Sequence, residues 1–223
     1  SEYPIEEHNW VCGAERADST GADVISSSLG YYDFDNAVFN YTYANMDGNT
    51  TMAAKGADLA VKKGLLVFNS VGNEGGNAWN FLVTPSDGDS VIAVGAVTST
   101  AVVGGFSSFG PSGDGQVKPD MASVGVAAMV QTTSNTIGTN NGTSFACPNM
   151  AGLGTILWQA FPEYNNMKIA QALKAAGSKF SAPDTRIGYG IPDLKLAFTN
   201  LLTEFATSTA TTNTCTVTLD WTS

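Results

Sequence analysis

The segment Asn141-Gly142-Thr143-Ser144-Phe145-Ala146-Cys147-Pro148 decides how this chain is interpreted. A polar turn delivers Ser144 to the start of a long apolar segment, and Pro148 is tolerated in the first turn of a helix, where its missing N–H costs nothing. Unpaired N–H groups and the positive end of the helix dipole suit a nucleophile and an oxyanion. On these residues alone, Ser144 is explained equally well as the N-cap of the helix.

A second segment, Ser70-Val71-Gly72-Asn73-Glu74-Gly75-Gly76, follows the apolar run 65–68. A buried strand that ends in Gly and Asn opens a loop at its carboxyl end, which is where open α/β sheets bind their ligands. The amide of Asn73 is a suitable donor to a developing oxyanion. Taken alone, however, the segment is better explained as an ordinary turn, because Asn and Gly are turn residues.

Together the two segments resemble the subtilisin-like serine proteases, the subtilases. The family's Gly-Thr-Ser-x-Ala-x-Pro motif carries its nucleophile and matches Ser144, and its Gly-Asn-x-Gly motif carries the oxyanion-hole asparagine and matches Asn73. The strand that ends in Ser28-Leu29-Gly30 resembles the family strand that lines the substrate cleft. Further similar segments follow in the family's order between about residues 10 and 200, namely 106–111, 117–120 and 188–193.

The resemblance implies a fold and a site. It implies an α/β fold of three layers with a mainly parallel sheet, and a serine endopeptidase in which Ser144 attacks while its own N–H and Asn73 hold the oxyanion. An extended polypeptide substrate would lie along Ser28, Leu29 and Gly30. The other wall of the pocket for the side chain before the scissile bond would be Ser70, Val71 and Gly72. Gly30 and Gly72 would leave room for a sizeable apolar side chain, whereas Glu74 at the mouth would favour a basic one. The sequence does not distinguish between these two preferences.

The triad's Asp and His have no match in this chain. The family order is Asp, His, Ser, but the one histidine, His8, precedes Asn9-Trp10 and lies too close to Ser28 for the intervening family elements. We therefore prefer to explain His8 as a loop or helix-start residue. The fold should be incomplete at its amino-terminal side, and the chain alone inactive. Residues 1–202 are assigned to the carboxyl-terminal part of a subtilase catalytic domain, with the missing amino-terminal segment of the same protein as a partner. Residues 203–223 form a Thr-rich tail or the start of a β module.

Composition limits the function classes. Twenty acidic and ten basic residues give a formal charge of −10, which argues against nucleic acid and anionic membranes as partners. A hydrophobic content of 43% excludes a disordered acidic chain, and no apolar run is long enough to span a membrane. The scarcity of charge favours a secreted or cell-surface protein. Three cysteines, Cys12, Cys147 and Cys215, suit neither a disulfide framework nor a zinc site, and Cys147 should pack as a buried apolar residue.

The apolar pattern predicts alternating helices and strands. Strands are expected at 23–29, 65–69 and 91–97, with short strands and loops over 101–139 and a long loop over 31–47. Helices are expected at 10–19, 51–63, 144–160, 167–176 and 193–202. The strand–helix–strand unit over 23–69 predicts parallel neighbours with a right-handed crossover.

Two other functions remain open. A pseudoprotease would bind extended peptides without cleaving them. A lipase or esterase of the α/β-hydrolase type would need a Gly-x-Ser-x-Gly elbow and a later His, and neither is present. No cofactor is required for the proposed chemistry. Structural calcium is common in the family, but no calcium-loop motif supports it here; Asp33, Asp35 and Asp47 are better explained as solvated loop carboxylates.

Overall fold

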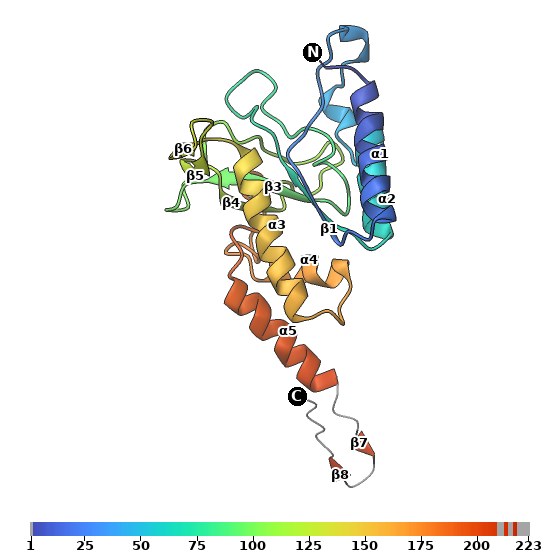
Figure 1. The fold of residues 1–223 in the computed structure, drawn as a ribbon, viewed down its shortest axis with the longest axis vertical. Coiled ribbons are helices and arrows are strands. Elements are labelled where there is room, and N and C mark those ends of the chain that lie inside the picture. The colour runs from blue at the N-terminus through green and yellow to red at the C-terminus, as the bar shows by residue number, and fades with distance from the viewer. Residues whose placement is uncertain (1, 209–211, 214–215, 218–223) are drawn as a thin grey trace.

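Four parallel strands form the central sheet. In the computed structural model, which describes residues 2–208, 212–213 and 216–217, the strands are β1 (Val24–Ser27), β2 (Leu66–Ser70), β3 (Ile92–Val97) and β4 (Met121–Val124). They lie side by side in chain order (Figure 1). Ser27 pairs with Asn69 and Ser70 pairs with Val94, so the carboxyl ends of β1, β2 and β3 meet at one edge. The predicted parallel sheet is confirmed.

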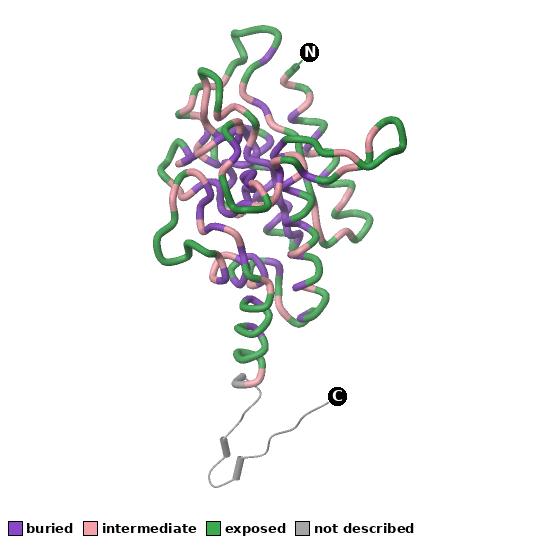
Figure 2. The backbone as a smooth tube through the Cα atoms, turned by 90° about the vertical axis from the view of Figure 1, so that its left-hand side faces the viewer, coloured by how far each residue is buried: buried purple, intermediate pink, exposed green. Residues whose placement is uncertain are grey.

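Helices cover both faces of this sheet. On one face lie α1 (Ile5–Ser19) and α2 (Met52–Lys62), and on the other lie α3 (Thr143–Ala160) and α4 (Asn166–Ala175). Side chains alternate along β2, so that Leu66 and Phe68 pack toward α3 while Val67 packs toward α2. Figure 2 shows the buried residues concentrated between these layers. The three-layer α/β architecture is as expected.

The remaining elements connect these layers or extend beyond them (Figure 1). They are two 3₁₀ turns within the long loop, a β5–β6 antiparallel pair before α3, the last helix α5 and a short β7–β8 pair. Their bounds are Ala37–Phe39 and Tyr43–Asn45 for the turns, Ala128–Gln131 and Ile137–Asn140 for β5 and β6, Leu194–Ser208 for α5, and Thr212–Asn213 and Thr216–Val217 for β7 and β8.

The first helix begins earlier than its apolar pattern indicates. α1 starts at Ile5 rather than near Trp10, because Pro4 occupies the N-cap with helical angles and Glu6 and Glu7 suit the positive end of the dipole. Glu7 is also bound in the interior: its carboxylate accepts from the hydroxyl of Tyr41 at 2.6 Å and from the backbone of Ala53 at 2.9 Å. These tertiary bonds anchor the first turn of α1 to the start of α2.

Two further helix ends differ from expectation. α2 begins at Met52 and is capped by Thr51, whose Oγ1 accepts from Ala54 N at 3.3 Å, so Thr51 is the cap and not the first helical residue. α5 continues to Ser208 rather than ending at Leu202. Within α5 the hydroxyl of Thr203 donates to the carbonyl of Thr199, so these threonines bond within the helix instead of ending it. The division of the chain at residue 203 stays a prediction, and most of the Thr-rich tail lies outside the described residues.

A buried ion network connects the segments that lead into β3 and β4. Lys118 is 1% exposed, and its ammonium donates to the carbonyls of Gly88 and Val91 and to Asp120 Oδ2 at 2.7–2.9 Å. Asp120 also accepts from Lys174 at 2.5 Å and from Ala93 N at 2.8 Å. Burial alone would raise the pKa of Asp120, but the two ammonium groups hold it below its usual value.

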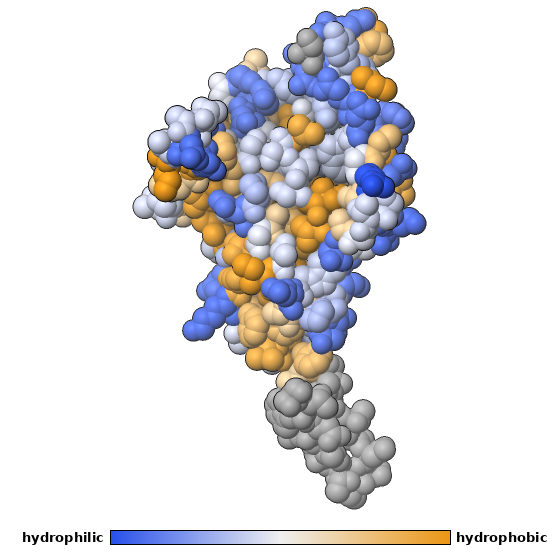
Figure 3. All heavy atoms as spheres, viewed as in Figure 1, coloured by the Kyte–Doolittle hydropathy of each residue, from blue (hydrophilic) through white to orange (hydrophobic). Residues whose placement is uncertain are grey.

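Apolar side chains are unevenly distributed on the surface. Figure 3 shows them gathered over α5 at the lower end of the molecule, where Leu196, Phe198 and Leu202 are exposed. Within the described residues, no helix has the length and apolar character needed to cross a membrane.

Candidate active site

Ser144 is the second residue of α3. Gly142 is the N-cap, with an extended backbone, and Thr143 is the first helical residue, so the alternative explanation of Ser144 as the N-cap of this helix is wrong. Phe145 N bonds to Gly142 O, whereas Ser144 N has no acceptor among the described residues. The site therefore has a half-buried hydroxyl next to a free N–H at the positive end of a helix of 18 residues.

Pro148 acts on the carbonyl of Ser144. It lies inside α3, four residues after Ser144, and not in the first turn where the sequence predicted it. A proline has no N–H to donate to the carbonyl four residues earlier. The oxygen of Ser144 accepts instead from Oγ of Ser28 at 3.1 Å. Because Ser28 directly follows β1, this bond holds the first turn of α3 against the end of the edge strand.

Asn73 is held in a defined orientation by the same turn. Its Oδ1 accepts from Thr143 N at 2.9 Å and from Thr143 Oγ1 at 3.0 Å. The amide oxygen therefore faces α3, and Nδ2 is left with no acceptor among the described residues. Nδ2 of Asn73 and N–H of Ser144 are the two free donors of this corner.

Both residues line one pocket. It has a volume of about 250 Å³, and its lining includes Ser144, Asn73, Ser28, Leu29 and Gly30. The parallel pairing of β1 with β2 explains this juxtaposition, because Ser28 follows β1 and Asn73 follows β2 on neighbouring strands. The arrangement presents a hydroxyl and two hydrogen-bond donors to one small space, as an acyl-transfer site requires.

The predicted substrate-binding residues lie beside this pocket with one exception. Ser70 and Gly72 line it, and Leu29 is 55% exposed, with its carbonyl held at 3.0 Å by Nδ2 of the buried Asn69. Val71 does not line it. Its side chain is fully buried with Met46 and Leu82, and its backbone bonds to Val94 and Val83 as a continuation of the sheet.

The lining of the pocket includes a residue that the sequence did not indicate, Val83. Val83 lies against both glycines of the walls: a Cβ on Gly30 would be 2.2 Å from Val83 Cγ2, and a Cβ on Gly72 would be 3.0 Å from it. Gly72 has φ of +109°, a conformation that favours glycine. No local pattern could have identified Val83, because it comes from the irregular segment between β2 and β3 and reaches the pocket only through tertiary packing.

Carboxylates surround the mouth of the pocket. Glu2, Glu6 and Glu74 all contribute to its lining. Burial and the neighbouring Glu6 raise the pKa of Glu2. Burial, with the charge of Glu74, raises the pKa of Tyr32 to about 12, so its hydroxyl stays protonated and donates to Glu74 at 3.1 Å. Tyr32 also stacks on Trp79, with ring centroids 4.5 Å apart, which makes this tyrosine a cleft residue.

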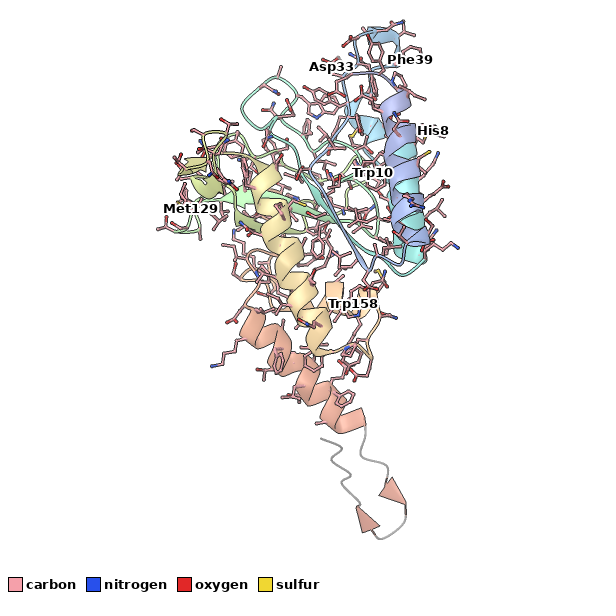
Figure 4. All side chains as sticks on the ribbon, in the orientation of Figure 1. His8, Trp10, Asp33, Phe39, Met129 and Trp158 are labelled. Atoms are coloured by element: carbon pink, nitrogen blue, oxygen red, sulfur yellow. The ribbon has the colours of Figure 1, made fainter. Side chains whose placement is uncertain are left out.

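His8 is not part of the site. It lies on α1 (Figure 4), is exposed, and its Nε2 is 3.7 Å from Cys12 Sγ one turn later. It does not line the pocket of Ser144, which agrees with the helix-start explanation. Cys147 is fully buried, and burial raises the pKa of its thiol to about 12, so it packs as an apolar residue and not as a nucleophile.

The loop carboxylates accept hydrogen bonds from other groups of the protein, which lie in the same loop for Asp47 and Asp33 and in the segment before α1 for Asp35. Asp47 accepts from the backbone of Asn49 and Thr50, Asp33 accepts from Asn40, and Asp35 accepts from Glu2 N. Across residues 2–208 and the one described strand pair beyond them, no group of three or more His, Cys, Asp or Glu side chains is placed to hold one metal ion.

Comparison with known proteins gives sequence relatives. The sequence model of the subtilase family (Peptidase S8) matches residues 6–190. The chain is 30% identical over 174 residues to subtilisin E of Bacillus subtilis (strain 168), which covers 77% of this chain and 40% of that protein. It is 31% identical over 174 residues to a thermophilic serine proteinase of Bacillus sp. (strain AK1), covering 78% and 37%. The chain thus spans about two fifths of the length of these curated relatives.

Solved structures share the fold. The patellamide maturation protease PatA matches with a TM-score of 0.70 and 23% identity, covering 88% of this chain and 69% of that one. The prenylagaramide maturation protease PagA matches with a TM-score of 0.69 and 21% identity, covering 87% and 67%. The family match covers β1 to β6, α3 and both motif segments described above, and this chain belongs to the subtilase family.

Proposed function

We propose that this chain carries the nucleophile and the oxyanion hole of a serine endopeptidase. The observation that supports this most directly is that Ser144 and Asn73 line one pocket at the start of α3, each with a free hydrogen-bond donor. In the proposed reaction, Oγ of Ser144 attacks a peptide carbonyl. The oxygen that becomes negative accepts from Nδ2 of Asn73 and from N–H of Ser144. Both donors and the nucleophile belong to this chain, so these steps use no cofactor.

The substrate in this proposal is an extended polypeptide. Ser28, Leu29 and Gly30 leave β1 beside Ser144 and offer backbone groups to a strand laid along them. Ser70 and Gly72 form the opposite wall. The names of the compared proteases describe those proteins alone. The proposal that this chain cleaves peptides is supported by the geometry of its own site.

The proposed general base comes from outside these residues. His8 is the one histidine, and its exposed position on α1 keeps it out of the pocket of Ser144. We propose that an amino-terminal segment of the same protein supplies the Asp and His, and that the chain alone is inactive.

Two grooves flank β1. One of about 610 Å³ lies against α1 and is lined by Trp10, Ala14 and Ile25, and one of about 470 Å³ lies against α3 and is lined by Val24 and Trp158.

The free edge of β1 is the proposed docking position for that segment. Among the described residues, β1 pairs only with β2, and its Ser26 is exposed. An unpaired strand edge presents N–H and C=O groups that accept a further strand. Apolar grooves on both sides of the edge would accommodate the side chains of such a strand and of a helix beside it.

A fluorophosphonate serine probe tests this proposal. We expect no labelling of this chain alone, and labelling of Ser144 when the upstream segment is restored, with Ser144→Ala as the negative control. Labelling of Ser144 in the short chain would contradict the missing base. A lack of labelling in the extended protein, with correct folding confirmed by circular dichroism, would contradict the endopeptidase.

The alternative is a pseudoprotease that binds extended peptides. It predicts that the upstream sequence lacks the Asp and His, and that the extended protein binds peptides without being labelled by the fluorophosphonate.

We also propose, from the low charge content, a secreted or cell-surface location, which fractionation of the source cells would test.

A further inference from the structure

The segment along which the substrate is proposed to lie has few bonds to the sheet. The ladder between β1 and β2 ends at the pair of Ser27 and Asn69. The next three residues, Ser28, Leu29 and Gly30, make no backbone–backbone hydrogen bond among the described residues. Most of their N–H and C=O groups are therefore available to an extended chain. Their position, however, has to be fixed by something other than the ladder.

The side chain of Asn69 provides this link. Its Nδ2 donates to the carbonyl of Leu29 at 3.0 Å and to the carbonyl of Ser70 at 2.9 Å. Leu29 belongs to one wall of the pocket beside Ser144, and Ser70 belongs to the other. One amide group thus joins both walls, and it continues the hydrogen bonding of the sheet beyond the last backbone pair.

The orientation of this amide is determined by its neighbours. Turning it over would place Oδ1 against two carbonyl oxygens, which have no hydrogen to donate. In the observed orientation, Oδ1 is buried and has no hydrogen-bond partner among the described residues. Because a buried acceptor without a donor is destabilising, stability alone does not explain an asparagine at this fully buried position.

We propose that Asn69 is a positioning residue, which holds the backbone of Leu29 against Ser70 and so sets the geometry in which an extended polypeptide pairs with residues 28–30. Asn69 acts through these two carbonyls and does not line the pocket itself. The inference rests on the proposed function, because it takes residues 28–30 as the place where the substrate lies.

Asn166 is a matched control within the same chain. It is also buried, and its Nδ2 also donates to two backbone carbonyls, those of Val61 and Leu65, both at 2.8 Å. This bridge lies at the amino end of β2, whereas the pocket of Ser144 lies at the carboxyl end. The two asparagines therefore make the same kind of bridge, and Asn69 alone of the two joins the pocket walls.

Two peptides that differ in backbone donors test the inference. One is acetylated tetra-alanine with a free carboxylate, and the other is the same peptide N-methylated at its inner residues, which removes their N–H groups. Calorimetry on the whole chain should show that the unmethylated peptide binds about ten-fold or more tightly than the methylated one, because only the former can pair fully with residues 28–30.

The variants should separate positioning from folding. Leucine is close to asparagine in size and has no donor, so Asn69→Leu should weaken the unmethylated peptide by about ten-fold and bring the two affinities within about two-fold. Asn166→Leu should lower the Tm to a similar extent and keep the wild-type ratio of affinities. Asn69→Ala removes the same donors, should give the same result, and serves if Asn69→Leu does not fold.

Three outcomes would overturn the inference. They are an Asn69 variant that keeps the wild-type ratio of affinities, an Asn166→Leu variant that loses this ratio to the same extent, and a wild-type chain that binds neither peptide. The proposed function is judged separately by the fluorophosphonate labelling of Ser144 in the extended protein, because a small phosphonate reacts without lying along residues 28–30.

Discussion

The two donors of the site depend on one neighbouring residue, Thr143. Its N–H and hydroxyl both donate to Oδ1 of Asn73, and it places Ser144 next in the helix. An amide whose oxygen accepts two hydrogen bonds is disfavoured from turning over, since its NH₂ group would then face a backbone N–H donor. The chemistry of Thr143 thus selects which end of Asn73 faces the pocket.

Removal of the amide of Asn73 should slow the chemical step. In the protein with its upstream segment restored, we expect Asn73→Ala to lower kcat by about 10²–10³ with KM little changed, a figure taken over from subtilisin itself. Steady-state kinetics on a peptide substrate measures this. Asn200→Ala, an exposed site on α5, is the matched control. A decrease confined to KM would show that Asn73 contributes to substrate binding rather than to the transition state.

Asp87 gives a prediction about pH. Its Oδ2 accepts from Gly48 N at 2.9 Å, while its buried Oδ1 has no partner among the described residues, and burial raises its pKa to about 6. A raised folded-state pKa favours folding while the group is protonated, and this contribution is lost as the pH rises through 6. Asp87→Asn should therefore raise the free energy of unfolding relative to the wild type, and this gain should be larger at pH 8 than at pH 4 by roughly 3 kcal/mol. Urea unfolding at both pH values measures this, and the exposed Asp18→Asn should show no such difference.

At the scale of elements, the strands and α3 were predictable, whereas two lining residues of the pocket, Tyr32 and Val83, were not. Apolar runs over 65–68 and 91–97 become the fully buried strands β2 and β3, because a strand covered on both faces needs apolar side chains throughout. The first turn of α1 was missed since its polar residues have no apolar period; Glu7 is held there by Tyr41 and Ala53, which are distant in sequence. The segment of Asn73 was identified by its motif, whereas Val83 and Tyr32 reach the pocket by tertiary contacts that leave no local pattern.

Lys118 links three segments around β3 and β4. Lys118→Met would leave two carbonyls, of Gly88 and Val91, without their buried donor and would remove one of the two ammonium partners of Asp120. We expect a loss of about 3–5 kcal/mol in the free energy of unfolding. Chemical denaturation measures it, with the exposed Lys195→Met as control. Equal stability of the two variants would mean that the network contributes nothing net.

At the scale of the molecule, the groove between α1 and β1 offers a direct test of the docking proposal. Gly13 lines this groove, and a Cβ placed on it would meet nothing within 4 Å. Gly13→Trp should therefore leave the stability of this chain nearly unchanged, yet lower both the Tm and the Ser144 labelling of the extended protein by blocking the upstream segment.

His8→Trp is the matched control for that variant. It places the same side chain on the same helix at an exposed position outside the groove, and it removes the one histidine. We expect the extended protein to keep its labelling with His8→Trp. Loss of labelling in this control would identify His8 as the base, and equal labelling with Gly13→Trp would place the upstream segment elsewhere.

The clamp of Thr143 on Asn73 also has an energetic consequence. Since the amide is already oriented before any peptide arrives, little side-chain entropy remains to be lost when the carbonyl enters. The dipoles need not reorganise as charge builds on the oxygen. The two donors are therefore preorganised for an anionic oxygen, and a peptide acid or aldehyde that is not cleaved should also bind to them.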